Sequence, residues 1–185
     1  MVGIRLKKFY STINQAVKMS EVKNTDVMYW EYPSRAYDSE QVASWFDKYL
    51  SNEFKTLKTE QKGNLFYIYS PDGYKAAFFI HGRSGSDMEL HDIIPSFHIY
   101  VYPFANNNGT VMGKDFFTFF FSPAQKTGDL IQPYKFNWDG SEQALYNGGF
   151  GCRPVDINNK HTPHYCSTLI EYNNWEVPDN YPFKF

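Results

Sequence analysis

IRLKKFYSTINQAVKMSEVK, residues Ile4–Lys23, sets an apolar stripe against a polar arc. Leu6, Phe9, Ile13 and Val17 fall on one side, while basic and polar residues fill most of the rest. This spacing has the period of about 3.6 residues that marks an amphipathic helix. A helix can bury such a stripe only against other elements, so we expect the strands that follow to lie across it.

The length and composition indicate one domain with a nearly neutral surface. The 185 residues suffice for a single domain, 1–185, with one hydrophobic core. The formal net charge is −2 and no basic run is longer than Lys7-Lys8, so we expect no nucleic-acid partner. Aromatic residues make up 19% of the chain, which favours strands and suits an extracellular surface or an interface.

A second helix is predicted over residues 38–58. Asp38 offers an N-cap with Gln41 three residues on, the capping-box arrangement. The i, i+3, i+4, i+7 spacing is then held by Val42, Trp45, Phe46, Tyr49, Leu50, Phe54 and Leu57.

Residues 65–121 are expected to form an antiparallel sheet. The predicted strands are 65–69, 74–81, 96–102 and 116–121, with turns at 70–73 and 106–109. The last strand, FFTFFF, is apolar on both faces, so both must be covered, by the first helix on one side and the C-terminal segments on the other. A short helix is expected over 165–171.

The two cysteines, Cys152 and Cys166, lie fourteen positions apart around a polar loop. They favour a disulfide over two buried thiols, and closing this loop would contribute about 3 kcal/mol. A disulfide implies an oxidising compartment, yet no secretory signal precedes Ile4 and no apolar run could span a membrane. We therefore expect that an upstream segment directs export and that Met1, with Val2 and Gly3, is not part of the natural chain.

Catalytic signatures are missing from the sequence. Gly82–Ser86 begins like a nucleophile elbow around Ser84, but its fifth residue is not glycine and no helix follows, so we expect a loop. His161 and His164 have the HxxH spacing of a metal pair; with Pro163 between them, the favoured alternative is that they are exposed to solvent or pack with the C-terminal tail. We expect no enzymatic activity.

Two polar loops have the oxygen-rich character of cation sites. A solvated loop is the alternative in both cases, so no cofactor is expected and calcium is the open possibility. The candidates are Asp87, Glu89, His91 and Asp92 in the first loop, and Asp156, Asn158 and Asn159 in the second.

Three stretches together resemble the type IV pilin and type II secretion pseudopilin family. Arg5–Ala16 resembles the point where the long first helix of these proteins enters the globular head, and Gly109–Phe119 is similar to the family's turn and GKDVF strand. The C-terminal stretch resembles the signature YC-x-x-LI-x-x-NGW-x-IP-x-DYP, here through Tyr165, Cys166, Leu169, Ile170, Trp175, Pro178, Tyr181 and Pro182.

The chain also departs from that pattern. Asn174 stands where the family has the glycine of NGW, and Tyr102–Asn106 replaces an aspartate-rich turn, which weakens any carry-over of metal binding. The family's apolar N-terminal half-helix, with its peptidase site, is absent from this sequence.

The resemblance implies an α+β pilin fold and a structural role. A spine helix would pack on an antiparallel sheet through Leu6, Phe9, Ile13 and Val17, and a Cys152–Cys166 disulfide would tie down residues 150–185. The implied partners are other pilin or pseudopilin subunits in an extracellular or periplasmic filament, together with the inner membrane before assembly. The alternatives from the residues are a secreted carbohydrate- or surface-binding module using exposed aromatic residues, and a secreted hydrolase using Ser84 or the histidines.

Overall fold

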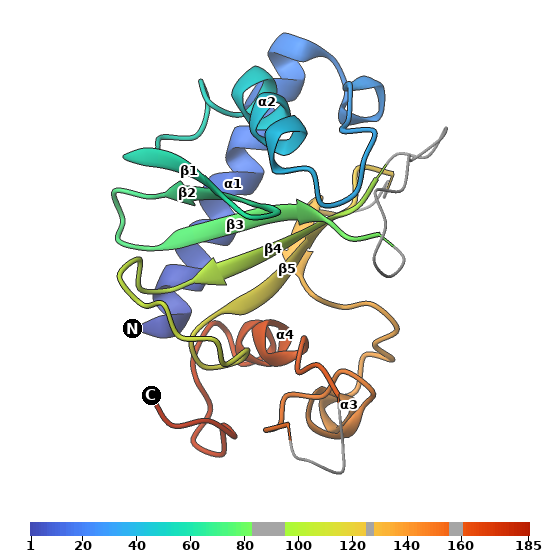
Figure 1. Cartoon of the computed structure of the whole chain (residues 1–185). Coiled ribbons are helices and arrows are strands. Elements are labelled where there is room, and N and C mark those ends of the chain that lie inside the picture. Colours follow the sequence, from blue (N-terminus) through green and yellow to red (C-terminus); the bar gives the residue numbers. More distant parts are fainter. Residues whose placement is uncertain (83–94, 125–127, 156–160) are drawn as a thin grey trace.

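The N-terminal helix α1 (Val2–Asn24) runs behind the sheet in Figure 1, in a computed structural model that describes residues 1–82, 95–124, 128–155 and 161–185. The predicted stripe of Leu6, Phe9, Ile13 and Val17 is buried, with at most 1% of each residue exposed. Val2 and Gly3 extend the helix beyond the predicted start and are buried too. The amphipathic period therefore predicted both the helix and its buried face.

The short 3-10 turn η1 (Val27–Tyr29) leads into α2 (Ser39–Tyr49). Asp38 is the N-cap, and its carboxylate accepts from the backbone N–H of Gln41 at 3.0 Å. The predicted extension of α2 to residue 58 is wrong.

Helix α2 ends because the chain turns at Leu50 and continues through a tight turn to Phe54. Apolar residues continue at helical spacing beyond the end of α2 because this turn, and not a helix, buries Leu50 and Phe54. Leu57, expected on the buried helix face, is 70% exposed.

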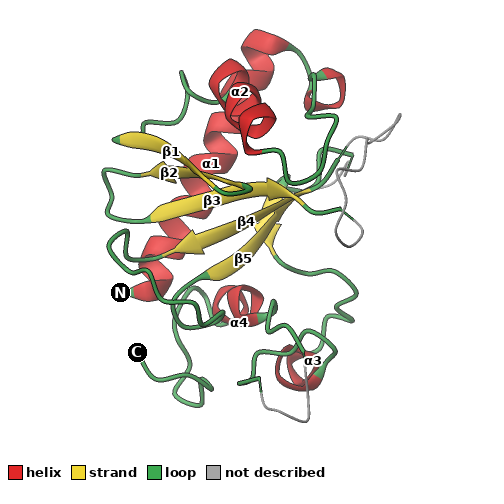
Figure 2. Ribbon diagram, viewed as in Figure 1, coloured by secondary structure: helices red, strands yellow, loops and turns green. Residues whose placement is uncertain are grey.

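Within the described residues, six strands form one antiparallel sheet in the order β1-β2-β3-β4-β5-β6, so each strand pairs with its neighbours in sequence (Figure 2). Their bounds are Lys58–Lys62, Leu65–Tyr69, Lys75–Ile80, Phe97–Tyr102, Phe117–Phe121 and Ile131–Pro133. The bounds of β2, β3, β4 and β5 agree with the four predicted strands to within one residue at each end.

The two edge strands, β1 and β6, were not predicted. Strand β1 reads KTEQK and is exposed at every position, so it has no apolar alternation, and its strand form comes from pairing with β2. Strand β6 has only three residues and ends in a proline, which is tolerated at a sheet edge.

The two faces of the sheet have different cover. Phe117, Phe119 and Phe121 of β5 point to the face covered by α1 and α2, where the ring of Phe9 lies 5.2 Å from that of Phe119. Thr118 points the opposite way, where Ser167 donates to its carbonyl oxygen at 2.6 Å. The expectation that the phenylalanine strand needs cover on both sides is confirmed.

Two short helices, α3 (Glu142–Asn147) and α4 (Cys166–Tyr172), lie below β5 in Figure 1. Helix α4 agrees closely with the short helix expected over 165–171. The structure is therefore α+β, with an N-terminal helix on an antiparallel sheet, and the disulfide between Cys152 and Cys166 is formed, with the two Cα atoms 4.6 Å apart.

Candidate functional site

Helix α1 is clamped onto the free edge of the sheet at β6. The side chain of Asn14 donates to the carbonyl oxygen of Ile131 at 2.7 Å and accepts from its N–H at 3.0 Å. Asp129, just before β6, accepts from Lys18 at 2.7 Å and from the hydroxyl of Tyr10 at 2.6 Å. Hydrogen bonds from Lys18 and Tyr10 lower the pKa of the Asp129 carboxyl, so Asp129 is ionised where it joins α1 to the sheet edge.

The first turn of α1 packs against the C-terminal segment. A Cβ on Gly3 would lie 1.8 Å from the carbonyl oxygen of Trp175, so the helix approaches that backbone as closely as only glycine allows. The Trp175 ring stacks on Phe119 with centroids 6.4 Å apart and meets the ring of Tyr10 at 5.2 Å. Trp175 therefore joins the helix, the sheet and the C-terminal segment.

Asn174 has φ of 56° and Trp175 φ of 67°, both in the left-handed region. Asparagine is one of the few residues with a side chain that enters this region at low cost. The backbone at position 174 thus accounts for asparagine at the position where the resembling motif has glycine.

The stretches around Gly113 and Tyr181, far apart in sequence, pack together. A Cβ on Gly113, whose φ is 86°, would lie 2.5 Å from the sulfur of Cys166 and 2.8 Å from the ring of Phe183. The hydroxyl of Tyr181 donates to the carbonyl oxygen of Gly113, and the Tyr181 N–H donates to that of Pro178. Pro178, Tyr181 and Pro182 are half-buried in this arrangement.

The disulfide joins the loop after α3 to the start of α4. Cys152 donates its N–H to Leu145 of α3 at 2.7 Å, and Tyr165, beside Cys166, donates to Phe150 at 2.9 Å. The C-terminal region is thereby fastened by covalent and hydrogen bonds although it contains little regular structure.

The outward arc of α1 carries large apolar side chains among lysines. Ile4 is 71% exposed, Met19 45% and Val22 88%, while Lys7 and Lys8 are exposed between them. A surface arc that mixes apolar and basic groups is suited to contact another molecule.

Three histidines from separate segments meet on the sheet face opposite α1. The rings of His81 and His98 stack at 5.2 Å, and those of His98 and His164 lie 6.0 Å apart. Burial, together with His164 and His81, lowers the pKa of His98 to about 3, and burial with His81 lowers that of His164 to about 4. Both rings are therefore neutral packing groups at neutral pH.

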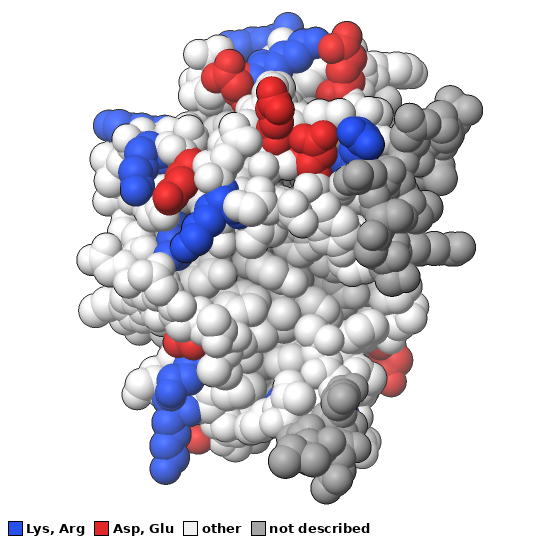
Figure 3. Space-filling model, in the orientation of Figure 1, with Lys and Arg blue, Asp and Glu red and all other residues white. Residues whose placement is uncertain are grey.

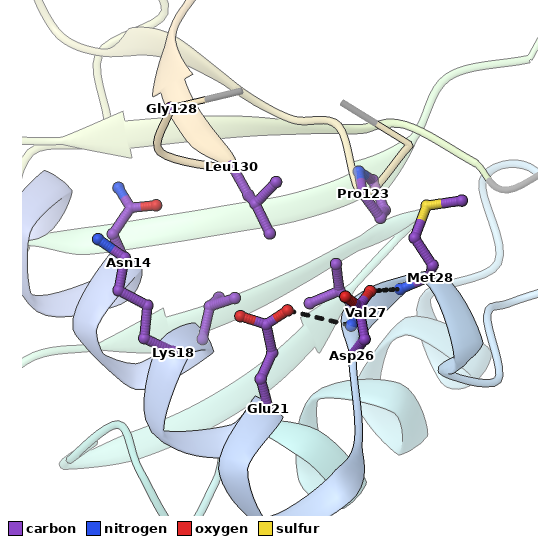
Figure 4. A pocket seen from close by; sticks show the side chains of 10 residues that line it. Asn14, Lys18, Glu21, Asp26, Val27, Met28, Pro123, Gly128 and Leu130 are labelled. Atoms are coloured by element: carbon purple, nitrogen blue, oxygen red, sulfur yellow. Dashed lines mark hydrogen bonds between the residues drawn. The ribbon is translucent and has the colours of Figure 1, made fainter. Parts of the chain in front are cut away.

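A cavity of about 310 Å³ lies beside the C-terminal half of α1 (Figure 4). Its two carboxylates are used locally: Glu21 accepts from the N–H of Val27 at 3.2 Å and Asp26 from that of Met28 at 2.8 Å. Both groups hold the turn that follows the helix.

His161 and His164 have different hydrogen-bond partners. His161 lies 3.0 Å from the carbonyl oxygen of Arg153, whereas the Nδ1 atom of His164 lies 2.9 Å from the hydroxyl of Thr118. Within the described ranges no group of three or more His, Cys, Asp and Glu side chains is arranged to hold a metal ion.

The remaining candidate residues fall outside the described parts of the chain. These are Ser84 with Gly85 and Ser86, then Asp87, Glu89, His91 and Asp92, and finally Asp156, Asn158 and Asn159. Among the described helices, none is both long and apolar enough to cross a membrane.

Asn14 is not recognisable as a site from the periodicity, because its importance depends on the strand that it meets. Ile131 is 117 positions away in sequence, and no pattern within α1 indicates that contact.

Comparison with known proteins identifies the chain by family alone. No curated protein and no solved structure matches it. Over residues 1–185 the chain matches the family of unknown function DUF6613, and it therefore belongs to that family.

Proposed function

We propose that this protein is a structural subunit of a type IV pilus-like filament or a type II secretion pseudopilus, which assembles through α1. The observation that carries the proposal is the outward arc of α1, where Ile4, Met19 and Val22 are exposed although the opposite arc is fully packed. Contact between this arc and a different surface of the next subunit would bury these side chains. The protein would then turn over no substrate.

The charge distribution supports head-to-tail contact between copies. Helix α1 contains five basic residues and one acidic residue, whereas the whole chain has a net charge of −2. The part outside α1 is therefore acidic and complements the helix. A contact between two different surfaces of the same chain repeats without closing, and such contacts build helical filaments.

The attachment of α1 to the rest of the domain supports a role in transmitting force along a filament. The helix is held to β6 by Asn14 and Asp129 and to the C-terminal segment by Gly3 and Trp175, so force on the helix passes into the sheet. The Cys152–Cys166 disulfide keeps the C-terminal segment in place under that force.

The proposal includes the location that the resemblance implies. The subunit would be held in the inner membrane before assembly by an apolar segment N-terminal to α1, and the filament would be periplasmic or extracellular. Mass spectrometry of the protein from its native cells tests this point: a mature N-terminus at Met1 would contradict it.

The test of assembly is a charge substitution on the outward arc. Met19→Glu combined with Val22→Glu places two carboxylates in the proposed contact, and we expect the variant to be lost from the filament fraction sheared off native cells. Val155→Glu, at a site 54% exposed and outside α1, is the matched control and should assemble normally. Equal recovery of both variants in that fraction, or recovery of neither the wild type nor the control there, would contradict the proposal.

A further inference from the structure

One row of side chains crosses four strands on the sheet face opposite α1. In the strand register Lys58 of β1 lies opposite Tyr69 of β2, Tyr69 opposite Lys75 of β3, and Lys75 opposite Tyr102 of β4. The ammonium of Lys58 lies 4.2 Å from the ring centre of Tyr69, and that of Lys75 lies 4.8 Å from that of Tyr102. We call Lys58, Tyr69, Lys75 and Tyr102 the lysine–tyrosine row.

Lys75 is a buried cation that makes no close ion pair in the described structure, and Glu60 acts on its charge only from a longer distance. Only 4% of the residue is exposed, and within the described ranges no carboxylate lies within 4.0 Å of its ammonium. Asn108 accepts one hydrogen bond from it at 2.8 Å, which leaves two of its three donors without a described acceptor. A buried charge is normally paired, so the site favours an incoming anion.

The neighbouring charges make the row positive. Lys62 stands on the same edge strand as Lys58, and the one acidic residue of that strand, Glu60, is occupied. Its carboxylate accepts from the hydroxyl of Tyr69 at 2.7 Å and lies 3.9 Å from Lys58. Figure 3 shows lysine and arginine side chains at the left of the view, with acidic side chains among them, beside a wide area without charged groups.

The tyrosines provide flat surfaces between the cations. Tyr69 and Tyr102 are half-buried, and so is Tyr67, which is next to the row and 6.4 Å from Tyr102 between ring centres. Rings of this kind present an apolar body and a polar hydroxyl, a combination that suits the face and edge of a sugar.

We propose that the lysine–tyrosine row binds an acidic polysaccharide, with sugar rings on Tyr69 and Tyr102 and a carboxylate on Lys58, while the buried charge of Lys75 near both rings adds long-range attraction. Neighbouring strands lie about 4.8 Å apart, close to the length of one pyranose unit, so successive units meet successive side chains. An open cavity of about 690 Å³ continues the row past Tyr69 to Arg5 and Phe104. This site specifies the carbohydrate-binding alternative and does not depend on filament assembly.

Lys58 can adapt to such a ligand. Its side chain is 61% exposed, so it can move from the ring of Tyr69 to a carboxylate without disturbing the core. Because these contacts are electrostatic and near the surface, the affinity should fall as the salt concentration rises.

Affinity electrophoresis tests the site with three probes: polygalacturonate, the neutral glucan dextran, and oligothymidylate. We expect polygalacturonate alone to retard the protein, less so at high salt. Tyr69→Ala and Lys58→Glu should each weaken its binding at least tenfold. Tyr29→Ala, at a ring 77% exposed outside the sheet, and Lys184→Glu, in the C-terminal tail, are the matched controls and should bind as the wild type does.

The variants concern half-buried or exposed positions, and thermal unfolding shows whether each is folded. Lys75→Met provides a further arm: if folded, it should lose binding to polygalacturonate. Equal retardation by dextran would overturn the role of the cations, and equal retardation by oligothymidylate would overturn the role of the sugar. Unchanged binding in Tyr69→Ala and Lys58→Glu, or no retardation of the wild type, would overturn the site itself.

Discussion

The side-chain amide of Asn14 makes the same pair of hydrogen bonds to the backbone of Ile131 that a neighbouring strand would make. It thereby closes the β6 edge of the sheet with a helix. The outward N–H and carbonyl groups of Ile131 are thus paired, which also protects them from pairing with another chain.

Removing this amide should destabilise the fold. Asn14→Ala leaves the buried N–H and carbonyl groups of Ile131 without a partner, so we expect the free energy of unfolding to fall by about 2–4 kcal/mol. Urea denaturation measures the change. Gln15→Ala, at the adjacent exposed position, should stay within about 0.5 kcal/mol of the wild type. Similar values for the two variants would show that the amide does not close the edge.

Gly113 should tolerate a side chain less well than another glycine of the same backbone conformation. Gly113 and Gly140 have φ of 86° and 87°, but a Cβ on Gly140 would meet nothing within 4 Å. Gly140→Ala should therefore cost only the conformational penalty of about 1–2 kcal/mol. Gly113→Ala should cost about 1–3 kcal/mol more, because its Cβ would clash with Cys166 and Phe183. Equal melting temperatures for the two variants would contradict this contact.

Loss of the disulfide should weaken the C-terminal region. We expect Cys152→Ala combined with Cys166→Ala to lower the free energy of unfolding by about 3 kcal/mol, because the loop of the unfolded chain is no longer closed. Equilibrium unfolding measures the loss, and a reductant should shift the wild type but leave the double variant unchanged. Free thiols detected by alkylation of the unreduced wild type would contradict the bond.

The histidine cluster should make the fold acid-sensitive. The pKa of His98 is lowered to about 3 and that of His164 to about 4, whereas an unfolded histidine titrates near 6.5. The stabilising effect of the neutral rings is therefore complete above pH 6.5 and is lost as the pH falls towards 4 and 3. Each histidine contributes a slope of up to about 1.4 kcal/mol per pH unit in that window.

Replacing one of these rings should flatten the pH dependence. His98→Phe keeps an aromatic group in place but cannot take up a proton, so its stability should fall less between pH 6.5 and 4 than that of the wild type. Thermal unfolding across this pH range compares the variant with the wild type, and parallel curves for the two proteins would refute the assignment.

Much of the secondary structure could be predicted because its signal is local. The stripe of α1 and the alternation in β4 arise from the periods of helix and strand, because the polarity of each residue indicates whether it faces the core or the solvent. The same reasoning explains the error in α2: Leu50 and Phe54 are buried at helical spacing, but by a turn, and apolar spacing cannot tell the two apart.

The contacts that give these elements their roles depend on tertiary structure. Strand β1 exists because β2 pairs with it, and Asn14 matters because Ile131, 117 positions away, reaches it. The lysine–tyrosine row arises only when four strands align in register, which places Lys58 and Tyr102 on one line.

The sequence alone determined α1, the start of α2, the four strands β2 to β5 and helix α4, and that two cysteines favour a disulfide, because the periodicity and composition of a segment depend on its own residues. Only the tertiary structure decided which distant residues contact one another. Gly3 against Trp175, Gly113 against Cys166 and His98 against His164 are each brought together by packing of distant segments, and the free energy of such contacts leaves no local pattern to read.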